Sequence, residues 1–222
     1  MMLRALVLLG VFTAWTCGSP QKGERWLLIG DDLAHDRGGW AYQLQQERRG
    51  GDLLNVSRPE MTAAFNLNRD RQLNAGEQIN NFLRRAYAEM GGLDVVVIAL
   101  GLNDCRDEFI GRNQERREGF ETLLARITTF FAERGQDRPK IIVATPLPLS
   151  PEQQAGGGFE RAARCIDELA VEIRDAVLAE GFCLTDWHQL PGPATLPHRT
   201  SPAELEVAGN QLVVAQLLAD CF

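Results

Sequence analysis

The sequence predicts an α/β domain of three layers, in which a five-stranded parallel sheet lies between two layers of helices. Short, continuously apolar runs alternate along the chain with longer segments of helical spacing. Runs that are apolar at every position are typical of strands covered on both faces. The longest irregular stretches all follow such runs. We therefore expect right-handed crossovers and a flavodoxin-like strand order.

The elements can be placed along the chain by these patterns. The expected strands are 26–29, 53–56, 94–100, 140–145 and 182–185. The expected helices are 40–49, 75–90, 116–134, 159–180 and 202–219. The last helix begins with Ser201-Pro202-Ala203-Glu204, a capping box with proline at the first helical position.

The chain has 222 residues and a formal net charge of −7, which becomes −8 once Arg4 is removed with the first sixteen residues. This length is typical of one domain with a sizeable core. The acidic balance argues against nucleic-acid binding, which normally needs a basic face. No phosphate loop or paired-cysteine zinc motif is present in the sequence. We therefore expect no cofactor and no metal, and a monomer is the simplest state.

The N-terminal segment is typical of an export signal. Arg4 precedes the apolar run 5–12, which is too short to span a membrane, and small residues follow. We assign 1–17 to a signal peptide, 18–24 to a linker and 25–222 to the folded domain. Cys17 follows Thr16, as in the lipidated cysteine of bacterial lipoproteins. The expected location is periplasmic, secreted or lipid-anchored at a membrane surface.

Four further cysteines are available for disulfides, which export permits. Three connectivities are possible. Cys105 and the start of the helix that holds Cys165 are expected at the carboxyl edge of the sheet. Cys183 begins the fifth strand at the opposite edge, where the final helix delivers Cys221. We predict the pairs Cys105–Cys165 and Cys183–Cys221.

Three blocks of polar residues follow strands or precede the last helix. The first strand ends in Gly30-Asp31-Asp32-Leu33, the third in Gly101-Leu102-Asn103-Asp104, and the last loop carries His198. This order and spacing resembles the SGNH (GDSL-type) hydrolases over nearly the whole mature chain, 26–218. The resemblance implies a three-layer α/β/α fold and an ester-hydrolase site at the carboxyl ends of the strands.

The resemblance also implies a role for each matching position. Asp32 stands where the family has its nucleophilic serine, and Asn103 matches the asparagine of the oxyanion hole. Glu60 stands near the position of a glycine that supplies a second oxyanion donor. His198 matches the base, and Thr195 stands where an aspartate would orient it. Two of these five positions therefore keep the family's residue, and the nucleophile is not one of them.

The missing serine changes the expected chemistry. Serine-type hydrolysis needs a hydroxyl proton that passes to histidine, and donors aimed at the developing oxyanion. An aspartate is ionised at neutral pH, since a free one titrates near ~4, and it would repel an oxyanion beside it. Glu60 would add a second negative charge if its side chain faced the site. Our leading interpretation is an impaired esterase that binds a small ester or glycan-like ligand.

Two enzymatic alternatives stay open. An active ester hydrolase could use Asn103 and His198 in a non-standard scheme. Alternatively, Asp32 could itself attack an alkyl carbon, with His198 activating the water that cleaves the resulting ester.

The remaining polar residues at the strand ends have structural and functional interpretations. Asp31 and Asp104, with Gly101, belong to the expected binding crevice. Crowded with Asp32, they could hold Ca²⁺ or Mg²⁺. We favour a structural role, in which Asp31 and Asp104 accept backbone N–H groups of their own loops. A basic cluster is expected to form a solvated face: Arg112, Arg116 and Arg117. We expect His35 and His188 to be exposed or to lie at the rim of the crevice.

Overall fold

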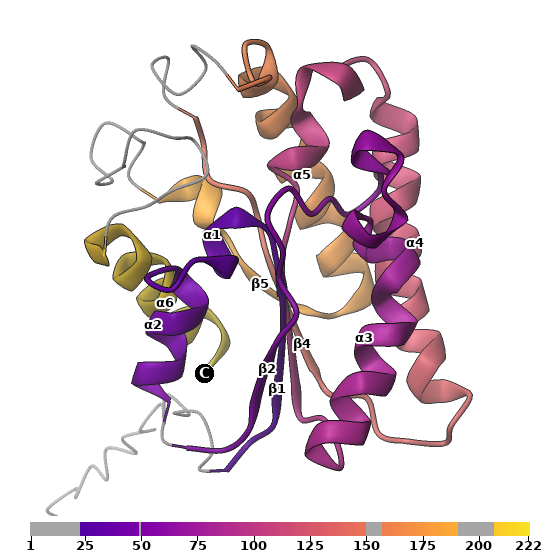
Figure 1. The fold of residues 1–222 in the computed structure, drawn as a ribbon, viewed down its shortest axis with the longest axis vertical. Coiled ribbons are helices and arrows are strands. Elements are labelled where there is room, and N and C mark those ends of the chain that lie inside the picture. Colours follow the sequence, from indigo (N-terminus) through magenta and orange to yellow (C-terminus); the bar gives the residue numbers. More distant parts are fainter. Residues whose placement is uncertain (1–22, 49, 150–156, 191–206) are drawn as a thin grey trace, which may run out of the picture.

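The computed structural model describes residues 23–48, 50–149, 157–190 and 207–222. Its sheet contains five parallel strands in the order β2-β1-β3-β4-β5 (Figure 1). The strands are β1 (Trp26–Gly30), β2 (Leu53–Asn55), β3 (Val95–Ala99), β4 (Lys140–Ala144) and β5 (Cys183–Thr185). The predicted fold class, strand positions and flavodoxin-like order are therefore confirmed.

The helices also follow the predicted segments, with shifts at their ends. They are α1 (Asp32–His35), α2 (Trp40–Glu47), α3 (Ala75–Met90), α4 (Asn113–Ala132), α5 (Ala162–Glu180) and α6 (Val207–Cys221). The prediction for α3 matches at both ends. The short helix α1 was not predicted, because four residues are too few to show a periodic pattern. The predicted capping box at 201–204 lies outside the described residues.

Helices cover both faces of the sheet. In Figure 1, α1, α2 and α6 lie on one side of the strands, and α3, α4 and α5 lie on the other. Alternate residues of β1 enter the two cores: Leu27 and Ile29 pack with the α3–α5 layer, and Trp26 and Leu28 pack with the opposite layer. Fully burying an apolar side chain of this size stabilises the fold by roughly 1.5–3 kcal/mol. The two-sided burial explains why the strands are apolar throughout.

Both predicted disulfides are present. Cys105–Cys165 joins the loop after β3 to α5, with 5.6 Å between the Cα atoms. Cys183–Cys221 joins β5 to the end of α6, with 5.9 Å between the Cα atoms. The first pair lies close to one of the predicted site residues, because Cys105 is two residues after Asn103. It therefore ties the Asn103 loop to a long helix.

The interpretation of Arg116 as part of a solvated face is wrong. Its side chain is only 1% exposed, and its guanidinium donates to Cys165 Sγ at 3.0 Å and pairs with Glu172 at 3.2 Å. Arg112 also differs from a freely solvated residue, since its guanidinium lies over the Phe65 ring, 4.6 Å from the centroid. The sequence shows the charge of Arg116 but not that α5, which holds Cys165 and Glu172, packs against its side chain.

The N-terminal predictions concern residues outside the described part of the chain. The signal peptide, the linker up to residue 22 and the anchor at Cys17 therefore stay predictions. Among the described helices, none combines the length and the apolar character needed to cross a bilayer.

Candidate functional site

The candidate site lies at the carboxyl ends of β1 and β3. From β1 the chain winds to β2 on one side, and β3 pairs with β1 on the other side, so the winding direction changes at this point. In open α/β sheets the ligand crevice forms beyond the strands at such a switch point. Asp32 follows β1, Asn103 follows β3, and the segment 56–66 follows β2. The topology thus gathers residues that are far apart in the sequence.

Asp31 sets the position of Asp32. Its side chain accepts the backbone N–H of Leu33 at 3.2 Å and so caps α1, which makes Asp32 the first residue of that helix. Asp31 is 3% exposed. Burial, and next the nearby charge of Asp32, raise the pKa of the Asp31 carboxyl well above its usual range. A cap of this kind is a structural role, as we favoured from the sequence.

The carboxylate of Asp32 receives two hydrogen-bond donors on one oxygen. Asp32 Oδ2 accepts the backbone N–H of Glu60 at 2.9 Å and the Nδ2 of Asn103 at 3.0 Å. These are the two positions to which the resemblance assigns oxyanion donors. Within the described part of the chain, Asp32 Oδ1 has no hydrogen-bond partner. One oxygen of Asp32 therefore lies where the resemblance would place an oxyanion, and the described residues leave the other without a partner.

Glu60 supplies a backbone donor at the position where the resemblance places a glycine. Its φ of 61° lies in the left-handed region, which residues other than glycine rarely adopt. In this conformation the backbone N–H of Glu60 points at Asp32 and donates to its Oδ2. The side chain is 43% exposed, and its carboxylate lies 3.5 Å from the guanidinium of Arg106. Because the donor is a backbone N–H, a glutamate at this position can supply it.

Asn103 is held in place from several directions. It is buried, and its Nδ2 also contacts the carbonyl oxygen of Met61 at 3.3 Å. Gly101 precedes it with a φ of 128°, and a Cβ there would lie 2.8 Å from Leu169 Cδ2. Only glycine fits this turn. With the disulfide at Cys105 on its other side, the amide of Asn103 is a preorganised donor.

Asp104 holds the segment after β2 by its backbone. It is 1% exposed, and its two oxygens accept the N–H groups of Ala63 and Ala64, each at 2.8 Å. Burial raises the pKa of Asp104 to about 6, while the two backbone donors and Arg116 act in the opposite direction. Asp104 therefore has a structural contact, as favoured, but its donors belong to the segment after β2 and not, as predicted, to its own loop. Among the described residues, no three His, Cys, Asp or Glu side chains gather as metal ligands.

Comparisons with known proteins agree with this fold. No protein-family model and no curated protein matches the sequence. Among solved structures, a carbohydrate acetylesterase from Sinorhizobium meliloti superimposes with a TM-score of 0.71 at 20% identity, covering 89% of this chain and 97% of that one. The aryl esterase of M. smegmatis (21% identity) and a putative arylesterase from Agrobacterium tumefaciens (18%) also reach 0.71, covering 88% of this chain and 97% of theirs.

The chain has the SGNH-hydrolase fold. Identities near 20% establish the fold alone, so the chemistry has to be argued from the residues of this chain. Within this SGNH-type fold, Asp32, Glu60 and Asn103 are brought together as the resemblance implied. Thr195 and His198, the predicted orienter and base, lie outside the described residues, and their roles stay predictions.

Two contacts at the site were not anticipated. Arg106 pairs with Glu60 and lies over the Phe159 ring at 5.2 Å, so it forms part of the rim. Met61 contributes its carbonyl to Asn103. An arginine in a polar loop and a backbone carbonyl carry no sequence signal that could have identified them. A motif search finds side chains, whereas half of this arrangement is made by the backbone.

The other two histidines of the described chain have peripheral positions. His188 Nδ1 lies 3.3 Å from the carbonyl oxygen of Pro146, and its Nε2 lies 3.2 Å from Asp167. His35 is exposed, with its Nδ1 3.1 Å from the carbonyl oxygen of Ser57. Both observations agree with their interpretation as exposed or rim residues.

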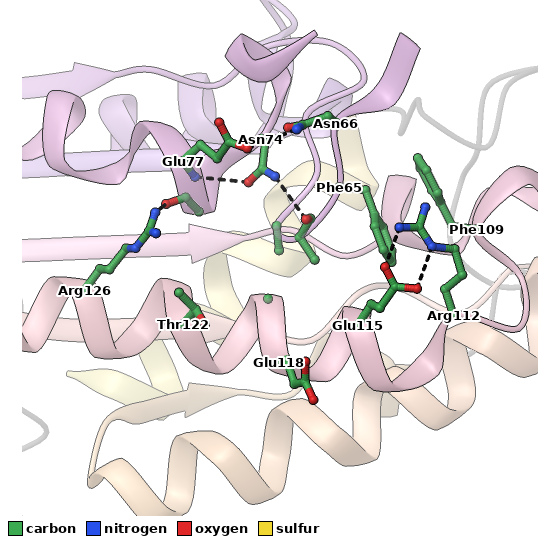
Figure 2. Close-up of a pocket in the computed structure, with 14 residues that line it drawn as sticks. Phe65, Asn66, Asn74, Glu77, Phe109, Arg112, Glu115, Glu118, Thr122 and Arg126 are labelled. Carbon is green, nitrogen blue, oxygen red and sulfur yellow. Dashed lines mark hydrogen bonds and ion pairs between the residues drawn. The ribbon is translucent and has the colours of Figure 1, made fainter. Parts of the chain in front are cut away.

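A surface groove of about 560 Å³ lies between α3 and α4, next to the segment that Asp104 holds (Figure 2). Its polar groups bond to one another: Arg112 binds Glu115 at 3.0 Å, and the Asn74 side chain caps α3 by accepting the N–H of Glu77 at 3.1 Å. The rings of Phe65 and Phe109 stack at 4.3 Å beside it. These contacts brace the loop behind the site and leave no reactive pair in the groove.

Proposed function

We propose that this protein uses an SGNH-type crevice to bind a small ester or glycan-like ligand, and that serine-type ester hydrolysis has been lost. The single observation that carries the proposal is the double hydrogen bond of Asp32 Oδ2 with Glu60 N–H and Asn103 Nδ2. Both donors that would stabilise an oxyanion are already engaged by a group that belongs to the protein.

The geometry opposes ester hydrolysis in two ways. First, Asp32 carries no hydroxyl proton that a base could remove to create an alkoxide. Second, a substrate carbonyl could reach the donors only by displacing Asp32 Oδ2, which would leave a carboxylate beside the developing oxyanion. Losing a single oxyanion donor already slows such reactions by roughly 10²–10³-fold. Here both donors are occupied and a like charge is added.

The ligand class is inferred from the fold and from the neighbours. Structures with this fold include aryl esterases and a carbohydrate acetylesterase, which by their names act on small esters and acetylated carbohydrates. We propose the same chemical class for the crevice of this chain. Two disulfides within one domain support action outside the cytoplasm. We further propose that the protein is a monomer and does not bind nucleic acid.

The first experiment restores the nucleophile. Wild type should neither hydrolyse p-nitrophenyl acetate above background nor react with a fluorophosphonate probe. Asp32→Ser should gain one or both activities, because the two donors are then released to an oxyanion. Asp36→Ser, at an exposed position just after α1, is the matched control and should gain neither.

The outcomes of this experiment separate the alternatives. Fluorophosphonate labelling of wild type, or wild-type turnover that His198→Ala abolishes, would show a working esterase and overturn the proposal. If Asp32→Ser is inactive, Asp32→Ser/Thr195→Asp rebuilds the complete residue set that the resemblance assigns. Inactivity of this double variant too would mean that the crevice has moved away from ester chemistry altogether.

Ligand binding is tested separately by NMR. Acetylated xylobiose should shift the backbone amide signal of Glu60 and the side-chain amide signal of Asn103 in wild type. The groove residue Thr122, on the far side of the loop, supplies a signal that should not move. A panel of acetylated sugars and aryl acetates without effect on Glu60 or Asn103 would refute the ligand class.

A further inference from the structure

We infer that Asp32 is a nucleophile toward alkyl substrates: its Oδ1 attacks an electrophilic saturated carbon, and water then cleaves the resulting aspartyl ester at Cγ. This inference rests on the proposed function insofar as a small ligand must enter the same crevice. It goes beyond that function, because it assigns a covalent reaction to the residue that blocks ester hydrolysis.

The first support is the asymmetry of the Asp32 carboxylate. Oδ2 accepts two N–H donors, whereas Oδ1 has no partner in the described part of the chain. The side chain is half-buried rather than enclosed. Asp104 and Asp31 differ, since Asp104 uses both oxygens and Asp31 is a buried cap. Asp32 differs from both in being only half-buried and in taking two donors on one oxygen, with no partner for Oδ1 among the described residues.

The alkylation step is balanced without proton transfer. A lone pair of Oδ1 forms the new C–O bond, and the C–X bond breaks with its electron pair on the departing halide. The carboxylate charge leaves with the halide, and the enzyme carries a neutral ester. Oδ2 becomes the carbonyl oxygen of that ester while it still faces the Glu60 N–H and the Asn103 amide. An alkyl halide is thus a substrate class that this step can accept.

The hydrolysis step uses the two donors directly. Water attacks Cγ of Asp32, and the electron pair of the C=O bond moves onto Oδ2. The developing oxyanion is therefore formed at 2.9 and 3.0 Å from two N–H donors that already point at it. Collapse of the intermediate expels the alkyl group as an alcohol, releases a proton to solvent and regenerates the carboxylate. The Glu60 and Asn103 donors are blocked to a substrate ester, but they already bind the carbonyl oxygen of an ester formed on Asp32.

The donors are held without the help of a substrate. The Glu60 N–H is oriented by a left-handed backbone conformation, and Asn103 is bound to the Met61 carbonyl and followed by a disulfide at Cys105. Preorganised donors of this kind need no rearrangement during the reaction. A carboxylate that only filled space would not require donors fixed from both sides.

The test measures oxygen exchange in wild type. The protein is incubated with 1-bromohexane or 4-nitrobenzyl bromide in H₂¹⁸O, and the peptide that contains Asp32 is analysed by mass spectrometry with bromide release as a second readout. We expect ¹⁸O in the Asp32 carboxylate, because water attacks Cγ. Direct attack of water on the substrate would place no ¹⁸O in the protein, and that result would overturn the inference.

Variants separate the two steps. Asn103→Ala removes one oxyanion donor, so hydrolysis should slow by roughly 10²–10³-fold and the alkyl adduct on Asp32 should accumulate. Asp32→Asn should show no adduct. The control variant Asp36→Asn removes an exposed carboxylate near Asp32 and should behave as wild type. If Asn103→Ala does not fold, the ¹⁸O measurement on wild type decides alone. A merely structural role of Asn103 would not convert turnover into a trapped adduct.

The result is distinguishable from failure of the proposed function. Neither adduct nor ¹⁸O at Asp32 with either bromide, together with shifts of Glu60 and Asn103 on ligand addition, would refute the covalent step and leave ligand binding intact. Label at Asp32 without binding of any acetylated ligand would support the covalent step and refute the ester or glycan ligand class.

Discussion

Asp32 and Asp104 lie just beyond neighbouring strands, and each holds the chain between Glu60 and Ala64 by its backbone N–H groups. They differ in how the donors are distributed. Asp104 takes one donor on each oxygen and is 1% exposed, whereas Asp32 takes both donors on Oδ2 and is half-buried. The comparison teaches that a carboxylate with both oxygens engaged serves the fold. At the half-buried Asp32, the oxygen without a partner among the described residues is the atom that we propose to react.

The largest effect that tests this comparison is expected on stability. Asp104→Ala removes the acceptors of two N–H groups inside the loop, and each unsatisfied group costs about 1–3 kcal/mol. We expect the free energy of unfolding, measured by chemical denaturation, to fall by about 2–4 kcal/mol. A loss below about 1 kcal/mol would contradict the structural role of Asp104.

The pH dependence of stability is the next test of the buried Asp104 carboxylate. The raised pKa of Asp104, about 6, means that the folded protein binds its proton more tightly than the unfolded chain does. Stability from this group therefore falls as the pH rises from about 4 to about 6, by about 2–3 kcal/mol in total, and is constant above that range. Asp31, whose pKa is also raised, acts in the same direction.

The contribution of Asp104 is obtained by comparing the pH dependence of unfolding in wild type and in a variant. Urea unfolding of wild type and Asp104→Asn at pH 4.5 and pH 7 isolates the contribution of Asp104, because the other carboxylates are common to both. The loss on going from pH 4.5 to pH 7 should be smaller in the variant. An equal loss in both proteins would place the titration elsewhere.

Asp32→Ala should cost less than either change at Asp104. Asp32 is half-buried, so water can replace its carboxylate at the two donors, and we expect a loss of about 1 kcal/mol or less. Thermal and urea unfolding beside Asp104→Ala provide the measurement. A cost for Asp32→Ala that equals the cost for Asp104→Ala would remove the distinction between a functional and a structural carboxylate.

The smallest expected effect is a gain. Glu60→Gly relieves a left-handed conformation that costs a residue with a side chain about 1–2 kcal/mol, while it gives up a long ion pair with Arg106 that is worth ~0–1 kcal/mol. A net stabilisation of about 0.5–1 kcal/mol should result. Glu60→Ala is the matched control, since it loses the ion pair but keeps the Cβ, and it should show no gain.

The fold and part of the site could be predicted from the sequence. Continuous apolar runs placed all five strands, and the positions of the cysteines relative to those strands identified both disulfides. Asp32 and Asn103 were recognisable because their blocks follow strands directly. The short helix α1, the burial of Arg116 and the rim position of Arg106 were not recognisable, because each depends on contacts between distant segments.

The sequence by itself determined which chemical groups meet at this edge of the sheet: strand periodicity and strand-end motifs are local properties, and parallel strands bring their carboxyl ends together. Only the tertiary structure decided what those groups do to one another. Glu60 reads as a lost glycine, yet its backbone N–H still reaches Asp32 across 28 residues, and Asn103 reaches the same oxygen across 71. A residue name specifies a side chain, whereas a donor made by the backbone depends on φ and on packing.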